Sequence, residues 1–328
     1  MPDLYDQITT TIIEQLIAGV VPWKSPYFST TGFPRNFATQ KEYQGINVLL
    51  LGSQHFTSPY FLTFLQAKEL GGSVKKGERG FLVVKYGTYN KEEDQTQEGE
   101  DTRKRGYLRG YKVFNSSQIE NIDFPEPPTA SALTTTEKTD RARAIIDSMP
   151  RRPPIHQGSA VPCYRLESDS VHMPKLGYFT SEEVYYSTLF HELGHATGHQ
   201  TRLARKSLMD NKGFGAFSDT SRKIYAEEEL VAEMTASFLS THAGIIEDDH
   251  VNSAAYLQSW IKALQGKDAR TWIVRAASQG QKAADFILGR SLNLEPEPNI
   301  RDPRPTESVS FVAKLNSRDL SSQPGRSR

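Results

Sequence analysis

The nine residues from His191 to His199, HELGHATGH, limit the folds open to this chain more than any other stretch of its sequence. They contain the pattern H-E-x-x-H, in which two histidines are four positions apart and a glutamate directly follows the first. Imidazoles at this spacing can share one metal ion when an α-helix stacks them on one face. Upstream, Thr180 and Glu183 form the capping-box pattern T-x-x-E. The sequence therefore predicts a helix that runs through Phe190 into the motif.

His191 and His195 are the first two predicted metal ligands, because a helix brings a ring nitrogen of each within about 2 Å of one ion. Glu192 is rotated by about 100° from His191 and so lies beside the ion. A carboxylate there can take a proton from water that the ion activates, and we assign Glu192 as the catalytic base. Catalytic zinc has three protein ligands and one open position, so a third ligand must be found.

His199 is a poor third ligand. On an unbroken helix it lies about 12 Å along the axis from His191, twice the rise between the first pair, which is too far for one ion. Gly198 could break the helix, as in H-E-x-x-H-x-x-G-x-x-H, but the position that this pattern reserves for its last ligand is Thr201. We therefore expect His199 near the carbonyl groups at the helix end, away from the metal.

A later helix, IYAEEELVAEMTASFLS, offers four glutamates. Helical angles place Glu227 in the apolar stripe, whereas Glu229 and Glu233 lie on a flank with small residues, where a neighbouring helix can approach closely. We predict Glu229 as the third ligand and Glu233 as the carboxylate that orients a histidine through its free N–H. Glu228 is the alternative ligand.

The order of the predicted elements indicates an α+β protein of two domains, since 328 residues suffice for two cores. We predict a first domain over residues 1–125, which includes a charged, mobile loop at 91–105. A linker rich in Pro, Thr and Ser follows at 126–139. The second domain covers 140–292, and a polar tail at 293–328 reads as disordered.

Within these domains the periodicity of apolar residues predicts individual elements. In the first domain we expect an amphipathic helix at 3–18, a short helix after Ser58–Pro59, and a hairpin that turns at Lys76–Gly77. In the second domain, two short strands lie between Ala160 and Met173, before the motif helix. Three more helices are expected at 222–242, 253–265 and 270–289.

The composition excludes several classes of protein. Thirty-nine basic and thirty-nine acidic residues cancel, so no global positive field draws the chain onto nucleic acid. The single cysteine, Cys163, excludes an intramolecular disulfide. No apolar run approaches the roughly 20 residues that cross a bilayer. The N-terminal MPDLYDQITT has acidic residues where a secretory signal is basic, so we expect a cytoplasmic protein.

Several stretches of the chain resemble the ArdC-type antirestriction proteins of conjugative plasmids, whose relatives also form part of TraC-type primases. The resemblance implies an N-terminal domain that binds single-stranded DNA and a C-terminal zincin-like metallopeptidase domain. It also implies protection of incoming plasmid DNA from restriction, with a host restriction-system protein as the candidate peptide substrate. The matching stretches are PWKSPY, NFATQKEYQGINVLLL, SPYFLTFLQAKELGGSVKKGERG, KVFNSSQIE, the stretch from Tyr164 to Pro174, HELGHATGHQTRLAR and YAEEELVAE.

Binding of single strands needs aromatic faces for bases and cations for phosphates, and the first domain has both close together. Without the loop at 91–105, residues 1–125 contain ten basic and eight acidic residues, so the domain is only slightly basic. The candidate DNA-binding residues are Trp23, Lys24, Tyr27, Arg35, Asn36, Lys41, Tyr43, Lys75, Lys76 and Arg79.

The sequence thus predicts a gluzincin-like peptidase with one Zn²⁺, or another divalent metal, on His191, His195 and Glu229. Two alternatives stay open. In the first, the protein protects DNA by occupancy and its zinc site is structural or vestigial, although a structural site needs no base such as Glu192. In the second, it is a general intracellular zinc peptidase, which predicts no affinity for single strands.

Overall fold

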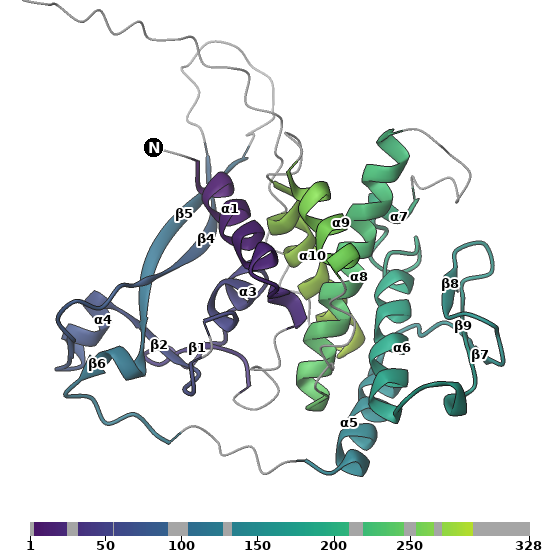
Figure 1. Ribbon diagram of the computed structural model, residues 1–328, viewed down its shortest axis with the longest axis horizontal. Coiled ribbons are helices and arrows are strands. Elements are labelled where there is room, and N and C mark those ends of the chain that lie inside the picture. The colour runs from purple at the N-terminus through teal and green to yellow at the C-terminus, as the bar shows by residue number, and fades with distance from the viewer. Residues whose placement is uncertain are drawn as a thin grey trace, which may run out of the picture.

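The computed structural model describes residues 3–24, 32–54, 56–90, 104–126, 133–209, 219–245, 254–265 and 271–290. The fold is α+β, with a strand-rich N-terminal half beside a mainly helical C-terminal half (Figure 1). The N-terminal elements are α1 (Leu4–Ile17), η1 (Pro22–Lys24), β1 (Arg35–Asn36), α3 (Ile46–Gly52), β2 (Tyr60–Thr63), α4 (Phe64–Glu69), β3 (Ser73–Val74), β4 (Phe81–Asn90), β5 (Lys104–Asn115), η2 (Ser116–Gln118) and β6 (Ile119–Glu120). The C-terminal elements are α5 (Thr135–Ser148), β7 (Ile155–Gln157), β8 (Cys163–Arg165), β9 (Ser170–Met173), η3 (Leu176–Tyr178), α6 (Glu182–Ala196), α7 (Lys206–Met209), α8 (Asp219–Ala243), α9 (Ala254–Leu264) and α10 (Trp272–Ile287).

The N-terminal half is built on a four-stranded sheet in the order β1-β2-β5-β4. The hairpin predicted at Lys76–Gly77 is wrong, because β3 pairs with β6 and β4 pairs with β5. The short helix predicted after Ser58–Pro59 starts later than expected. Residues 60–63 form β2, and Thr63 caps α4 in a capping box with Gln66. A local cap thus decides where the strand ends and the helix begins.

Strands β4 and β5 form a long antiparallel ribbon, with residues paired from Phe81 and Val113 to Asn90 and Lys104. The side-chain amide of Asn47, on α3, closes the outer edge of β4. Its Nδ2 donates to the carbonyl of Val84, and its Oδ1 accepts from the amide of Val84, both at 2.8 Å. This pair of hydrogen bonds mimics a neighbouring strand and fixes α3 against the ribbon.

In the C-terminal half, α8 is packed between α6 and α10, and the sheet β7-β9-β8 lies beside α6 (Figure 1). Glycines allow the close approach of the helices. A Cβ atom added at Gly194 of α6 would lie 3.2 Å from the Cα of Ala232, and one at Gly280 of α10 would lie 2.9 Å from the Cβ of Met234. The backbone of α8 is therefore in near contact with both neighbours, which fixes the direction of its side chains toward α6.

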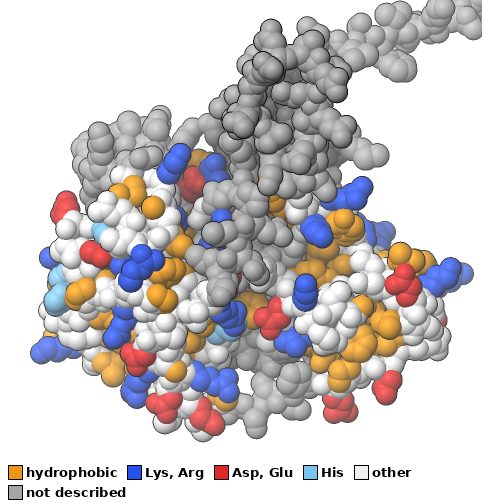
Figure 2. All heavy atoms as spheres, turned by 180° about the vertical axis from the view of Figure 1, so that it is seen from behind, with side chains coloured by type: hydrophobic (Ala, Val, Ile, Leu, Met, Phe, Trp, Pro, Cys, Tyr) orange, Lys and Arg blue, Asp and Glu red, His pale blue; other side chains and the backbone are white. Residues whose placement is uncertain are grey.

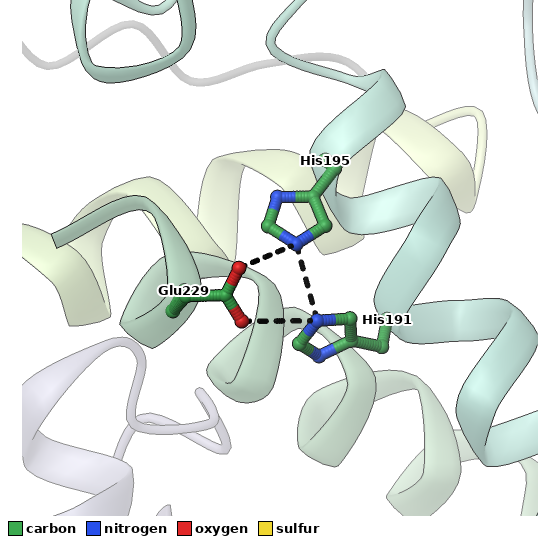
Figure 3. Close-up of side chains that lie close together, drawn as sticks. All are labelled: His191, His195 and Glu229. Atoms are coloured by element: carbon green, nitrogen blue, oxygen red, sulfur yellow. Dashed lines mark hydrogen bonds and ion pairs between the residues drawn. The ribbon is translucent and has the colours of Figure 1, made fainter. Parts of the chain in front are cut away.

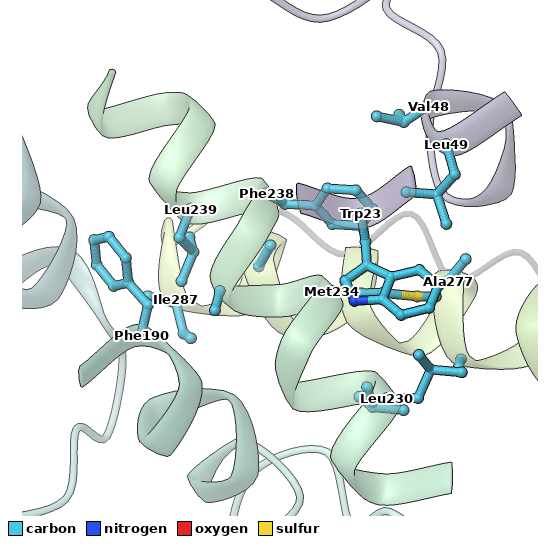
Figure 4. Packing of buried hydrophobic residues seen from close by; sticks show 14 of the residues in the cluster. Trp23, Val48, Leu49, Phe190, Leu230, Met234, Phe238, Leu239, Ala277 and Ile287 are labelled. Carbon is cyan, nitrogen blue, oxygen red and sulfur yellow. The ribbon is translucent and has the colours of Figure 1, made fainter. Parts of the chain in front are cut away.

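The two halves share one hydrophobic core. Trp23, in η1, is fully buried, and it lies beside Leu230 and Met234 of α8 (Figure 4). Its ring makes an edge contact with that of Trp260, on α9, at 5.7 Å between centroids. The buried residues of α1, Ile8, Ile12 and Leu16, belong to the same cluster. The helix that carries the predicted third ligand is thus packed directly against the N-terminal segment.

Helix α5 begins at Thr135, with Thr134 and Glu137 as its capping box, so residues 135–139 are helical and not linker as predicted. The predicted helices at 3–18, 222–242, 253–265 and 270–289 correspond to α1, α8, α9 and α10. Most of the predicted loop at 91–105, and the tail at 293–328, lie outside the described residues.

Within the described part of the chain, no helix is both long and apolar enough to cross a membrane. On the face seen in Figure 2, charged side chains of both signs are interspersed.

Candidate metal centre

Helix α6 carries the H-E-x-x-H motif in its last two turns and ends at Ala196. Its N-cap is Ser181, whose hydroxyl accepts from the amide of Val184 at 3.2 Å, so the cap predicted at Thr180 lies one residue too early. Glu183 instead accepts from the Thr135 hydroxyl at 3.2 Å, a contact that ties α6 to α5. The motif is nevertheless on a helix, as its chemistry requires.

Three side chains converge between α6 and α8 (Figure 3). The Nε2 atoms of His191 and His195 lie 3.1 Å apart, and each lies 3.5 Å from a different carboxylate oxygen of Glu229. The three ligand atoms lie within 4.8 Å of one another. Two imidazoles and one carboxylate are a donor set of catalytic zinc, and their approach to a common point fits a single ion.

Glu228 occupies the position next to His195 that we predicted for Glu233. Its Oε1 lies 3.3 Å from Nδ1 of His195. The Glu228 carboxylate is buried, and it accepts from Nη2 of Arg205 at 2.5 Å and from the hydroxyl of Ser207 at 2.6 Å. The helical-angle argument for Glu233 could not include Arg205, the buried cation that makes it favourable for Glu228 to face α6.

Arg205 connects the end of α6 to α8. Its guanidinium is buried, and it donates to the carbonyl of Gly194 at 2.7 Å, to the hydroxyl of Thr197 and to both oxygens of Glu228. These bonds satisfy carbonyl groups at the helix end and neutralise the buried carboxylate at the same time. Arg205 and Glu228 thus support the metal ligand His195 from behind.

The electrostatics of the centre follow from this packing. Burial alone lowers the pKa of His195, but the carboxylates of Glu228 and Glu229 outweigh it and raise the pKa to about 10. Burial raises the pKa of Glu228, yet the charge of Arg205 and the bond to His195 bring it down to about 2. The pKa of Glu229 is also held well below its usual range: its hydrogen bonds to His191 and His195 outweigh burial. Both carboxylates are therefore ionised at neutral pH.

Glu192 is buried, with 7% of its surface exposed, as expected for a base shielded from bulk water. Tyr225, one turn before Glu229 on α8, was not predicted. Its hydroxyl is hydrogen-bonded to the Glu229 carboxylate, and burial, that carboxylate and the charge of Glu192 together raise its pKa above the usual range. The spacing of four residues from Glu229 was the signal in the sequence that could have indicated it.

His199 lies outside the cluster, in the turn that follows α6. Its Nδ1 is 2.8 Å from the hydroxyl of Thr201 and 3.6 Å from a carboxylate oxygen of Asp169. Asp169 in turn pairs with Arg202. The expectation that His199 sits at the helix end, away from the metal ligands, is confirmed.

Two of the aromatic residues predicted to contact DNA, Trp23 and Tyr43, are buried or partly buried. Trp23 is fully buried in the shared core, so it cannot stack a base unless the core opens. Tyr43 is partly buried against a smaller hydrophobic cluster of the N-terminal half, and its ring makes an edge contact with that of Phe61. The cluster contains Leu51, Phe61, Val83 and Val113. Tyr27 and the side chain of Lys24 lie outside the described residues. Sequence alone could not separate a core aromatic from a stacking one, because both occur in the same local pattern.

The predicted polar contacts are divided between bonded and exposed side chains. Arg35 pairs with Glu42 at 2.9 Å, and Asn36 donates to Gln66 at 3.0 Å. The Nζ atom of Lys75 donates to the carbonyl of Ser117 at 2.7 Å. The remaining predicted residues are exposed; they are Lys41, Lys76 and Arg79.

Two family models match the chain in adjacent segments. The N-terminal domain of anti-restriction factor ArdC matches residues 2–114, and a zincin-like metallopeptidase matches residues 141–279. The second match includes His191, His195 and Glu229.

Solved structures of the antirestriction protein ArdC from plasmid R388 resemble most of the chain. The metal-free form is 39% identical, with a TM-score of 0.67, over 87% of this chain and 97% of that one. The Mn(II)-bound form is 36% identical, with a TM-score of 0.66, over 90% and 100%. The likeness therefore extends over both halves.

Curated relatives include the DNA primase TraC of Escherichia coli, 34% identical over 303 residues. The alignment covers 87% of this chain and 27% of the primase, so the chain spans about a quarter of that protein. The protein y4eC of Sinorhizobium fredii is 32% identical over 296 residues, which cover 87% of this chain and 91% of y4eC.

Proposed function

Because the chain belongs to the family of ArdC antirestriction proteins, we propose that it binds single-stranded DNA and hydrolyses peptide bonds at a zinc site, protecting incoming conjugative DNA from host restriction. The observation that carries the peptidase proposal is the convergence of His191, His195 and Glu229, with the buried Glu192 beside them. A carboxylate that is no ligand and lies next to three ligands is suited to proton transfer.

A divalent cation on these ligands supplies Lewis acidity, which polarises a carbonyl group and makes water a nucleophile near neutral pH. Zn²⁺ suits the donor set, and the Mn(II)-bound form of the R388 protein supports the use of other divalent metals. Glu192 takes the proton of the attacking water and returns it to the leaving amine. Glu228 and Arg205 keep Nε2 of His195 turned toward the ligand cluster.

The substrate is proposed to be an extended segment of a host restriction-system protein in the cytoplasm. Strand β8 is an edge strand of the sheet β7-β9-β8, and that sheet packs beside α6. Its outer side can add a peptide strand through backbone hydrogen bonds, which bind without demanding a particular sequence. Pairing of this kind would present an extended peptide along α6.

The test is conjugation of a plasmid into a restricting recipient with the Glu192→Gln variant, accompanied by measurement of bound metal. We expect metal content to be retained and protection to be lost, because the substitution removes a base and no ligand. Glu167→Gln, an exposed substitution in the turn before β9, is the matched control and should protect fully. Full protection by a metal-loaded Glu192→Gln protein would contradict the hydrolytic role and favour protection by occupancy.

A further inference from the structure

Lys85 of β4 and Arg109 of β5 lie directly opposite each other in the ribbon. Both side chains are exposed, and within the described part of the chain neither makes an ion pair or a hydrogen bond to another side chain. Like charges directly opposite one another destabilise a strand pair. An anion bound between these two cations would relieve that repulsion.

An exposed aromatic ring lies beside the two cations. Tyr111 is two residues beyond Arg109 on β5, and side chains two positions apart on a strand point to the same face. The Tyr111 side chain is 39% exposed, although its register partner Val83, on the same face, is buried against Leu51 and Phe61. The ring of Tyr111 can therefore stack a base, and the charges of Lys85 and Arg109 beside it can bind phosphates.

Both faces of the ribbon carry packed apolar side chains. On the face of Lys85 and Arg109 these are Phe81, Val83 and Val113. The other face carries Leu82, Val84 and Leu108, which pack against the main hydrophobic cluster. A Cβ atom at Gly110 would lie 3.0 Å from Leu4 of α1, so the helix lies against that side. Among the described side chains of the face that carries Lys85, the exposed ones are Lys85, Arg109 and Tyr111.

The charge of the ribbon suits a polyanion. Strands β4 and β5 contain five basic residues and no acidic residue, in a chain whose total charge is zero. Surfaces that bind single strands combine cations with aromatic rings, as Lys85, Arg109 and Tyr111 do here.

We propose that the ribbon face formed by Lys85, Arg109 and Tyr111 is the surface on which single-stranded DNA lies. The proposal rests on the DNA-binding function proposed above and gives it a location. Tyr111 stacks a base, and Lys85 and Arg109 hold the phosphates beside it. The ribbon face takes the role that we had assigned to Trp23, which is enclosed in the core.

The experiment is fluorescence anisotropy of a labelled oligo(dT) with the full chain over a series of salt concentrations. The first variant is Lys85→Gln/Arg109→Gln. Its matched control is Arg141→Gln/Lys175→Gln, which removes the same charge from exposed positions on α5 and after β9. In the ribbon variant, the slope of the logarithm of the binding constant against log salt should become less steep by roughly 1.4, because each cation at a single strand contributes about 0.7. The control should leave the slope unchanged.

Tyr111→Thr tests stacking and keeps a residue that favours strands. It should weaken binding roughly 5- to 150-fold, the range for loss of one stacked base, without a change in salt slope. Equal thermal midpoints of all variants would show that the fold is intact. Wild-type affinity and slope in the ribbon variants would overturn the location while leaving DNA binding in place. An equal loss in the control variant would also overturn it.

Two further outcomes separate this inference from the proposed function. If the wild-type protein shows no salt-dependent binding of oligo(dT), the DNA-binding function fails and the location fails with it. If the ribbon variants bind DNA normally but lose protection in conjugation, the face contacts a protein, and the proposal is overturned.

Discussion

Oε1 of Glu228 lies 3.3 Å from Nδ1 of His195, whereas Nε2 of the same ring faces His191 and Glu229. The orientation of a metal ligand is thus set by a buried carboxylate on its far side. That carboxylate has its own buried cation, Arg205, so the geometry of the centre depends on residues that cannot reach the ion.

Glu228→Gln keeps the shape of the side chain and removes its charge. We expect metal affinity to fall about 10- to 100-fold, because the substitution weakens the support of His195 and removes no ligand. Competition with a fluorescent chelator measures the change. Glu229→Gln, which alters the ligand, should cost more than Glu228→Gln. A larger loss in Glu233→Gln than in Glu228→Gln would return the supporting role to Glu233.

Arg205→Met leaves the Glu228 carboxylate buried without its cation. We expect unfolding free energy to drop by roughly 3–5 kcal/mol, the cost of one partner removed from a buried pair. The double variant Arg205→Met/Glu228→Met should recover much of this loss, since no uncompensated charge remains. Urea unfolding of the three proteins gives the coupling energy. Additive losses would mean that the two residues do not act as a pair.

Trp23→Ala should destabilise both halves together by about 3–5 kcal/mol, because it removes a fully buried ring from the shared core. Thermal unfolding followed by circular dichroism should show one transition at a lower midpoint. Tyr178→Ala is the matched control, since 82% of that ring is exposed. Two separate transitions in the Trp23→Ala protein would show that the halves unfold independently.

Gly280→Ala tests the close contact of α8 and α10. The new methyl group would lie 2.9 Å from the Cβ of Met234 and 3.4 Å from backbone atoms of α8, which cannot move aside alone. Overpacking costs about 1–3 kcal/mol and should exceed the gain of up to about 1 kcal/mol in helix propensity. Gly177→Ala, which meets no atom within 4 Å, should be nearly neutral. Differential scanning calorimetry compares the two; a midpoint unchanged in Gly280→Ala would contradict the tight packing.

His242 predicts a loss of stability in acid. Burial lowers its pKa to about 4, helped by the charge of Arg290, and its ring lies 4.8 Å from that of Phe33. With an unfolded pKa near 6.5, the unfolded chain binds a proton first as pH falls. His242 therefore contributes stability above pH 6.5 that is lost toward pH 4, about 2 kcal/mol of it by pH 5.

The measurement for His242 is urea unfolding at pH 7 and pH 5. The His242→Gln protein should lose about 2 kcal/mol less than wild type between these two values. His156→Gln, at an exposed position, is the control and should behave as wild type. An identical pH dependence in wild type and His242→Gln would rule out this source of acid sensitivity.

The helix with His191, Glu192 and His195 could be predicted because its pattern is local: spacing, cap and helical rise are all present in fifteen residues. The ligand role of Glu229 could also be predicted from helical angles, because Glu229 lies on a second regular helix. The role of Glu228 was not, because it depends on Arg205, 23 residues away, and on how α8 turns its side chains toward α6. A helical wheel shows relative angles, whereas only packing shows which angle faces the neighbour.

The DNA surface shows the same limit. The stretch GYLRGYKVF lies in β5, and tyrosines and an arginine alternate in its sequence. Which of its side chains stay exposed depends on α1, which packs near Gly110, and on Leu51 and Phe61, which pack with Val113; all three lie far from β5 in the sequence. The burial of Trp23 could not be predicted either. An aromatic residue in a loop-rich segment has the sequence pattern of an exposed ring, and only the fold shows which helices enclose it.

The common core of Ile8, Trp23 and Met234 has a consequence for inheritance. Although the two family models match separate segments, residues 2–114 and 141–279, a cut between them would leave α8 without the residues that cover it. A gene that acquired only the catalytic segment would encode an exposed apolar surface prone to aggregation. We therefore expect the sequence to pass between genomes, and into longer polypeptides, as one indivisible unit.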